Sequence, residues 1–158
     1  MGVGGEMQEE ESFLEIDFSY VVDPKLRDVL QRFHREAADA YRGKRYVAAV
    51  VLSGSVLEGI LTFALMKRET EAKEQFQRMR EKKPRAISDW HLEDLIEVAE
   101  GLGLIGATAA KAAPAVRDFR NMIHPYKLLR RSSPRWDALA GMALNALAEI
   151  SRSLSGRI

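Results

Sequence analysis

The sequence predicts an all-α fold, a single-domain bundle of about five helices with an extended N-terminal arm. The chain has 158 residues, which is enough for one domain with a buried core. Long segments carry apolar residues at helical spacing, and glycine and proline are sparse within them. A hydrophobic content of 46% and a charged content of 30% are typical of a globular protein.

The N-terminal segment is expected to differ from the rest. Residues 1–23 carry seven acids and no base, and residues 1–11 are expected to form a flexible leader. Apolar residues alternate loosely over residues 13–22, which predicts either an extended arm on the surface or a short strand. We therefore divide the chain into a leader and arm at 1–22 and a helical domain at 23–158.

Two long helices follow. Asp23-Pro24 is a favourable helix start, with aspartate as N-cap and proline at the first helical position, and Gly43 ends this helix. Residues 45–66 could nearly span a bilayer, but Glu58 near their middle and several small polar residues disfavour this. We expect the central, most buried helix of the bundle, no membrane partner, and a counterion for Glu58, because a buried charge must be paired.

The middle of the chain is more polar. Residues 67–83 are highly charged and predict an exposed extension of the preceding helix or a projecting hairpin arm. Ser88 or Asp89 is expected to cap a helix that reaches Ala99, and the run 101–103 (Gly-Leu-Gly) should end it.

Two further helices complete the predicted bundle. The first runs from about residue 108 to 124, with Pro114 either kinking it or marking its first turn. Residues 126–134 should form a basic loop, and Pro134 or Arg135 should begin a last helix through Leu154. Residues 111–158 carry nine bases against three acids, which can attract nucleic acid, although a solvated helical face has the same composition.

The most informative stretch is residues 117–125, Arg-Asp-Phe-Arg-Asn-Met-Ile-His-Pro. On a helix, the apolar residues form a stripe on one side, and four polar residues share another within roughly 100° of arc. Those polar residues are Arg117, Arg120, Asn121 and His124. Guanidinium groups bind phosphate and an imidazole transfers protons near neutral pH, so this combination suits chemistry on a phosphate. The structural alternative is a histidine that ends a helix among structural arginines.

These residues resemble the signature helix of HEPN domains, which have an arginine, four to six intervening residues and a histidine. Six residues separate Arg117 from His124, at the upper limit of the pattern. A polar residue often follows the arginine in this pattern, and Asn121 follows Arg120. Only three residues separate Arg120 from His124, however, so the choice of motif arginine stays open. Residues 48–65 also resemble the family's early core helix, and residues 94–105 resemble its lead-in to the signature helix.

The resemblance implies a metal-independent endoribonuclease of the toxin or defence type that needs no cofactor. The first residues are polar and acidic and do not read as a secretory signal, so we expect a cytoplasmic location. His124 would transfer a proton, Arg120 or Arg117 would hold the phosphate, and Asn121 would orient the histidine or the phosphate. Further phosphate or RNA contacts are expected from the basic loop, at Lys127, Arg130 and Arg131. The resemblance also implies a homodimer with facing motifs, and a possible antitoxin or other partner protein.

Two other functions remain open. The sequence also fits a non-catalytic interaction module of HEPN type that docks a partner protein or nucleic acid. It fits equally a helical dimerisation domain whose basic motif pairs with Glu58 or the acidic arm. Other chemistry is disfavoured, because the chain has no cysteine and the spacing of His91, Glu93 and Asp94 does not place a metal triad on one face. His34, among charged neighbours, is expected at the surface.

Overall fold

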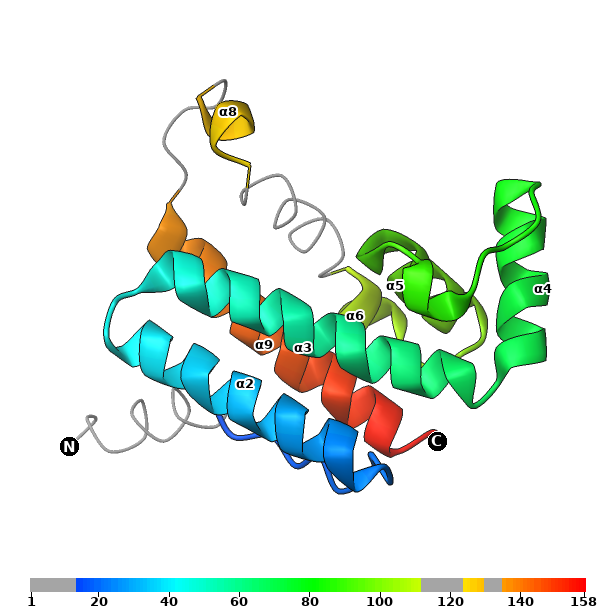
Figure 1. The fold of residues 1–158 in the computed structure, drawn as a ribbon, viewed down its shortest axis with the longest axis horizontal. Helices are drawn as coiled ribbons and strands as arrows, with labels where there is room; N and C mark the ends of the chain where they lie inside the picture. Colours follow the sequence, from blue (N-terminus) through cyan, green and yellow to red (C-terminus); the bar gives the residue numbers. More distant parts are fainter. Residues whose placement is uncertain (1–13, 112–123, 130–134) are drawn as a thin grey trace.

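The computed structural model describes residues 14–111, 124–129 and 135–158, and within these ranges it is all-helical without strands. Three long helices form the body of the molecule: α2 (Pro24–Arg42), α3 (Tyr46–Met66) and α9 (Trp136–Ser155). In Figure 1, α3 crosses the front with α2 alongside, and α9 passes behind them. The predicted all-α bundle is confirmed.

Local sequence explains the α2–α3 hairpin. The Asp23 carboxylate accepts hydrogen bonds from the backbone N–H groups of Lys25 (2.9 Å) and Leu26 (3.3 Å), which satisfies donors that have no partner at a helix start. Gly43 ends α2, and its N–H donates to the Asp39 carbonyl at 2.9 Å. The predicted start and end of this helix are therefore confirmed.

Helix α3 is central, as predicted, because it packs against α2, α5 and α9. It buries nine side chains, among them Leu57 and Leu61, but α9 also buries nine, so α3 is not distinctly the most buried helix. One face of α3 stays exposed, with Val47, Val51 and Glu58 on it. The expectation that Glu58 is a buried charge needing a counterion is wrong, because water solvates its carboxylate on this uncovered face.

α3 is also the one helix in the described ranges that is long and apolar enough to cross a membrane. Length and composition alone do not distinguish a membrane span from the core helix of a bundle. Its contacts with α2, α5 and α9 fit the core helix of a bundle, in agreement with the sequence-based expectation.

The polar middle of the chain folds beside one end of α3. Helix α4 (Glu69–Arg80) stands apart from the three long helices, followed by the 3-10 turn η1 (Ile87–Asp89), α5 (Leu92–Gly101) and α6 (Ala107–Ala110). The predicted extension of α3 is wrong, because the chain turns at Lys67 and Arg68 and α4 is a separate helix. α5 ends at the predicted glycine. The predicted cap is wrong, because Ser88 and Asp89 lie in η1 and His91 precedes α5 without a side-chain capping bond.

A short helix, α8 (Pro125–Leu128), occupies part of the predicted basic loop. Proline at its first position explains this difference, since its fixed φ suits a helix start and its missing N–H costs nothing there. Arg135 is the N-cap of α9, close to the predicted start of the last helix.

Residues 14–22 form an arm without helix or strand that packs on the bundle. Phe18 and Val21 are fully buried in the core, and the Tyr20 hydroxyl makes a 2.8 Å hydrogen bond with Ser151 of α9. Burial raises the pKa of Tyr20 to about 12. Phe18 also covers His34 of α2, so the expectation that His34 lies at the surface is wrong.

Candidate functional site

Much of the sequence-based site lies outside the described residues. Arg117, Arg120 and Asn121 fall in the undescribed range 112–123, and Arg130 and Arg131 fall in 130–134. Lys127 is described only as a residue of the α8 backbone. His124 is the one proposed catalytic residue whose surroundings the structure gives.

His124 immediately precedes α8 and its side chain is exposed. Pro125 follows as the first residue of the helix, a position that suits its fixed φ and its missing N–H. The imidazole is therefore open to a ligand, as proton transfer to a substrate requires. It is not packed into the core, so it does not have the surroundings of a structural histidine.

Two exposed side chains beside His124 were not singled out in the sequence. Tyr126 is 85% exposed and Leu129 is 80% exposed, both on or directly after α8 (Figure 1). An exposed aromatic ring next to a candidate phosphate site can stack on an unpaired base. The available signal was an aromatic residue two positions after His124, within a basic segment of the chain.

The other two histidines have different surroundings. His34 is only 5% exposed, its Nε2 atom has no hydrogen-bond partner, and burial followed by the charge of Arg42 lowers its pKa to about 4. His91 is exposed at the start of α5. A buried imidazole without access to substrate cannot serve as a general base, so His124 and His91 remain as candidates by exposure alone.

The described residues contain no cluster of side chains arranged to bind a metal ion. No group of three histidine, aspartate or glutamate side chains among them is close enough to hold a metal ion. Asp94, one of the three residues that the sequence places close together at the start of α5, accepts a hydrogen bond from Arg80 at 3.0 Å.

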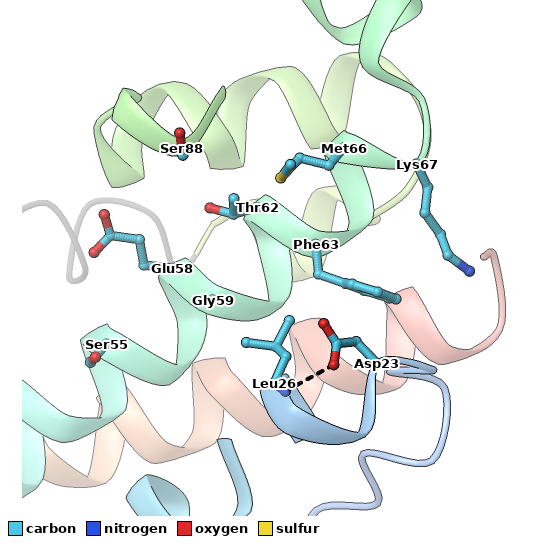
Figure 2. Close-up of a pocket in the computed structure, with 10 residues that line it drawn as sticks. All are labelled: Asp23, Leu26, Ser55, Glu58, Gly59, Thr62, Phe63, Met66, Lys67 and Ser88. Atoms are coloured by element: carbon cyan, nitrogen blue, oxygen red, sulfur yellow. Dashed lines mark hydrogen bonds between the residues drawn. The ribbon is translucent and has the colours of Figure 1, made fainter. Parts of the chain in front are cut away.

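A groove of about 530 Å³ lies elsewhere, between the start of α2, the second half of α3 and η1. Figure 2 shows Glu58 and Lys67 toward opposite ends of it, with Phe63 and Met66 between them, and the Lys67 ammonium lies 5.2 Å from the centre of the Phe63 ring. Its other lining residues are Asp23, Leu26, Ser55, Gly59, Thr62 and Ser88.

This groove is shallow, because none of its ten lining residues is buried. It contains no histidine, and the Asp23 carboxylate is already engaged in capping α2. A small-molecule site usually encloses most of its ligand, and this groove does not. It therefore offers an open polar and apolar surface and lacks the groups of a catalytic centre.

Comparison with known proteins adds no relative. No family model, curated protein or solved structure matches the chain. The functional argument therefore depends on the residues themselves and on the exposure of His124.

Proposed function

We propose that this chain is a HEPN-like, metal-independent endoribonuclease of the toxin or defence type. The observation that carries the proposal is the spacing of Arg117, Arg120 and Asn121 before His124 in the sequence. Two structural features support it: the described residues form an all-α bundle, and the His124 imidazole is exposed.

In the proposed reaction, His124 accepts the proton of a ribose 2′-hydroxyl as that oxygen attacks the adjacent phosphorus. The bond from phosphorus to the 5′-oxygen breaks, the protonated imidazole returns its proton to that oxygen, and a 2′,3′-cyclic phosphate remains. The guanidinium group of Arg117 or Arg120 stabilises the charge that grows on the phosphate oxygens. Asn121 orients the imidazole or the phosphate.

Substrate binding is assigned to the segment around α8. Lys127, Arg130 and Arg131 supply positive charge for neighbouring phosphates, and the exposed Tyr126 ring supplies a stacking surface for one base. Single-stranded RNA fits this combination, because its bases are free to stack on an aromatic side chain. We further propose a cytoplasmic homodimer in which two such segments face each other.

The test is cleavage of varied single-stranded RNAs in excess EDTA. His124→Ala should lower the cleavage rate by about 10² to 10⁴, the usual contribution of a general acid or base. His91→Ala is the control, since it removes the exposed imidazole that precedes α5, and it should lower the rate much less than His124→Ala does. Arg117→Ala and Arg120→Ala identify the phosphate-binding arginine by the larger loss.

Equal cleavage by wild type and His124→Ala would refute the mechanism. Absence of cleavage by wild type on all RNAs would instead favour the second candidate, a non-catalytic interaction module. The exposed apolar side chains Val47, Val51 and Met66 on α3 support that candidate, since they are available to a second copy or a partner protein. Sedimentation would show whether the chain dimerises. A protein concentration of roughly tens of micromolar is suitable, because a dimer with a micromolar dissociation constant is populated there.

A further inference from the structure

The end of α4 and the loop after it carry a concentration of positive charge. Residues 78–85 read Arg-Met-Arg-Glu-Lys-Lys-Pro-Arg, with five bases and one acid. Arg80 is engaged within the protein, because its guanidinium group bonds to Asp94 at 3.0 Å and to Glu97 of α5. The remaining four bases are Arg78, Lys82, Lys83 and Arg85. All four are exposed, and no ion pair joins them to an acid in the described ranges. We call these four the α4 basic surface.

The beginning of α4 has different electrostatics. There the bases are matched by acids one helical turn away, with Lys73 2.7 Å from Glu69 and Arg68 4.0 Å from Glu71. Ion pairs thus neutralise both bases at the start of α4, whereas none joins the four cations of the α4 basic surface to an acid in the described part of the chain. Figure 1 shows α4 at one end of the molecule, beyond the last turn of α3, so the α4 basic surface belongs to that end.

The backbone that carries these cations is anchored. The rings of Phe76 and Trp90 stack with centroids 4.6 Å apart, and the Trp90 indole N–H donates to the Arg85 carbonyl at 3.0 Å. Arg80 fastens the last turn of α4 to α5. A ligand that binds here therefore loses less free energy to ordering the loop than it would on an unanchored loop.

We propose that the α4 basic surface binds the phosphate backbone of nucleic acid, at the end of α3 opposite α8. Lysine and arginine neutralise phosphates, and the aromatic rings nearby, Phe76 and Trp90, are buried and cannot stack on bases. Binding is accordingly independent of base sequence and strongly salt-dependent. A membrane surface fits less well, because residues 78–86 present no exposed large apolar side chain for insertion.

This inference goes beyond the proposed cleavage, since it concerns a second surface and holds whether or not the chain is an enzyme. The test is fluorescence anisotropy of a labelled polyuridine of about 20 nucleotides, a length suited to single-strand site sizes. The intact chain is titrated between about 50 and 200 mM NaCl. Four phosphate contacts contribute about −3 to the slope of the logarithm of the association constant against the logarithm of the salt concentration. Over this range of salt the affinity should fall about 50-fold from these contacts.

The test variant changes all four residues of the α4 basic surface to glutamine. Its matched control removes the same charge from α2, in the substitutions Lys25→Gln, Arg32→Gln, Arg35→Gln and Arg42→Gln. We expect the salt slope of the test variant to become shallower by about 3, and that of the control by less than half as much. Circular dichroism checks that both fold, and Glu81→Gln, which only removes an exposed acid, should tighten RNA binding.

Equal changes of slope in the two variants would overturn the proposal, because they would reflect attraction by total charge. An unchanged slope in the test variant, or weaker binding by Glu81→Gln, would overturn it as well. Polyglutamate is the competitor that separates nucleic acid from acidic protein. Competition by polyglutamate at equal charge concentration, as effective as unlabelled RNA, would identify an acidic protein as the ligand instead.

Discussion

The three-helix core and the segment around α8 use their side chains in opposite ways. In the core, Leu57 of α3 and Leu147 of α9 are almost completely buried, and they hold the bundle together. Around α8, Tyr126 and Leu129 are almost completely exposed and contribute little to the core. Stability and the proposed chemistry therefore depend on separate regions, and we expect that each can be changed without the other.

The two regions also place the same residue type in contrasting surroundings. His34 is buried beneath Phe18, with ring centroids 5.8 Å apart, whereas His124 is exposed ahead of α8. An imidazole can act on a substrate only where the substrate reaches it. Exposure therefore excludes His34, and the spacing of Arg117 and Arg120 before His124 distinguishes His124 from the exposed His91.

The largest effect is expected in the core. Leu57→Ala should lower the free energy of unfolding by about 2 to 5 kcal/mol, because Leu57 is 1% exposed and its loss leaves a cavity. Urea denaturation measures the change. Val51→Ala is the control on the same helix, and at 43% exposure it should cost about 0.5 kcal/mol or less. RNA cleavage by the folded Leu57→Ala protein should be unchanged, and a loss of activity would contradict the separation of the two regions.

The second effect is a dependence of stability on pH caused by His34. Burial holds its pKa at about 4 in the folded protein, below the ordinary value of 6.5 in the unfolded chain. The unfolded chain therefore binds this proton first as the pH falls. The His34 contribution is complete above pH 6.5 and is lost between about pH 6.5 and 4, by roughly 3 kcal/mol.

Urea denaturation at several pH values tests this expectation. His34→Leu should flatten the stability profile between pH 6.5 and 4 relative to wild type. The difference between the profiles isolates His34 from the carboxylates that also titrate near pH 4. Identical profiles for wild type and His34→Leu would show that His34 is solvated in the folded state.

Local sequence signals predicted most of the fold. Asp23-Pro24 and Gly43 bound α2, and the apolar run through Leu57 became α3, because caps and periodicity act over a few residues. His34 and Glu58 were predicted wrongly, since their burial depends on distant segments. Phe18 covers the histidine, whereas no described segment covers the outer face of α3 at Glu58.

The candidate site was less predictable than the fold. The motif ending at His124 is visible in the sequence, because helical spacing alone places its residues on one face. The exposure of Tyr126 and the anchoring of residues 78–85 by Trp90 were not visible, since both result from packing between segments. Sequence patterns thus identified candidate chemistry, and tertiary contacts identified which surfaces are available to a ligand.

The third effect concerns binding in the α8 region. Tyr126→Ser should weaken binding of single-stranded RNA by about 1 to 3 kcal/mol, the usual contribution of one stacked base. The melting temperature should not change, because the ring is exposed. Tyr46→Ser, at a half-buried ring that contacts Tyr41, is a contrasting change that should lower stability and leave RNA affinity unaltered. Unchanged RNA affinity of Tyr126→Ser would remove this ring from the proposed site.

The smallest effects come from two glycines of α3, and they should have opposite signs. A Cβ atom at Gly59 would lie 2.8 Å from Cδ2 of the buried Leu30. Gly59→Ala should therefore destabilise the protein, because overpacking costs about 1 to 3 kcal/mol and exceeds the gain in helix propensity. A Cβ atom at Gly54 would meet nothing within 4 Å, so Gly54→Ala should stabilise the helix by about 0.5 to 1 kcal/mol. Thermal unfolding of the two variants beside wild type measures both signs. Stabilisation by both substitutions would mean that α2 and α3 pack less closely than the structure shows, and destabilisation by Gly54→Ala would mean that the exposed face of α3 is covered in solution.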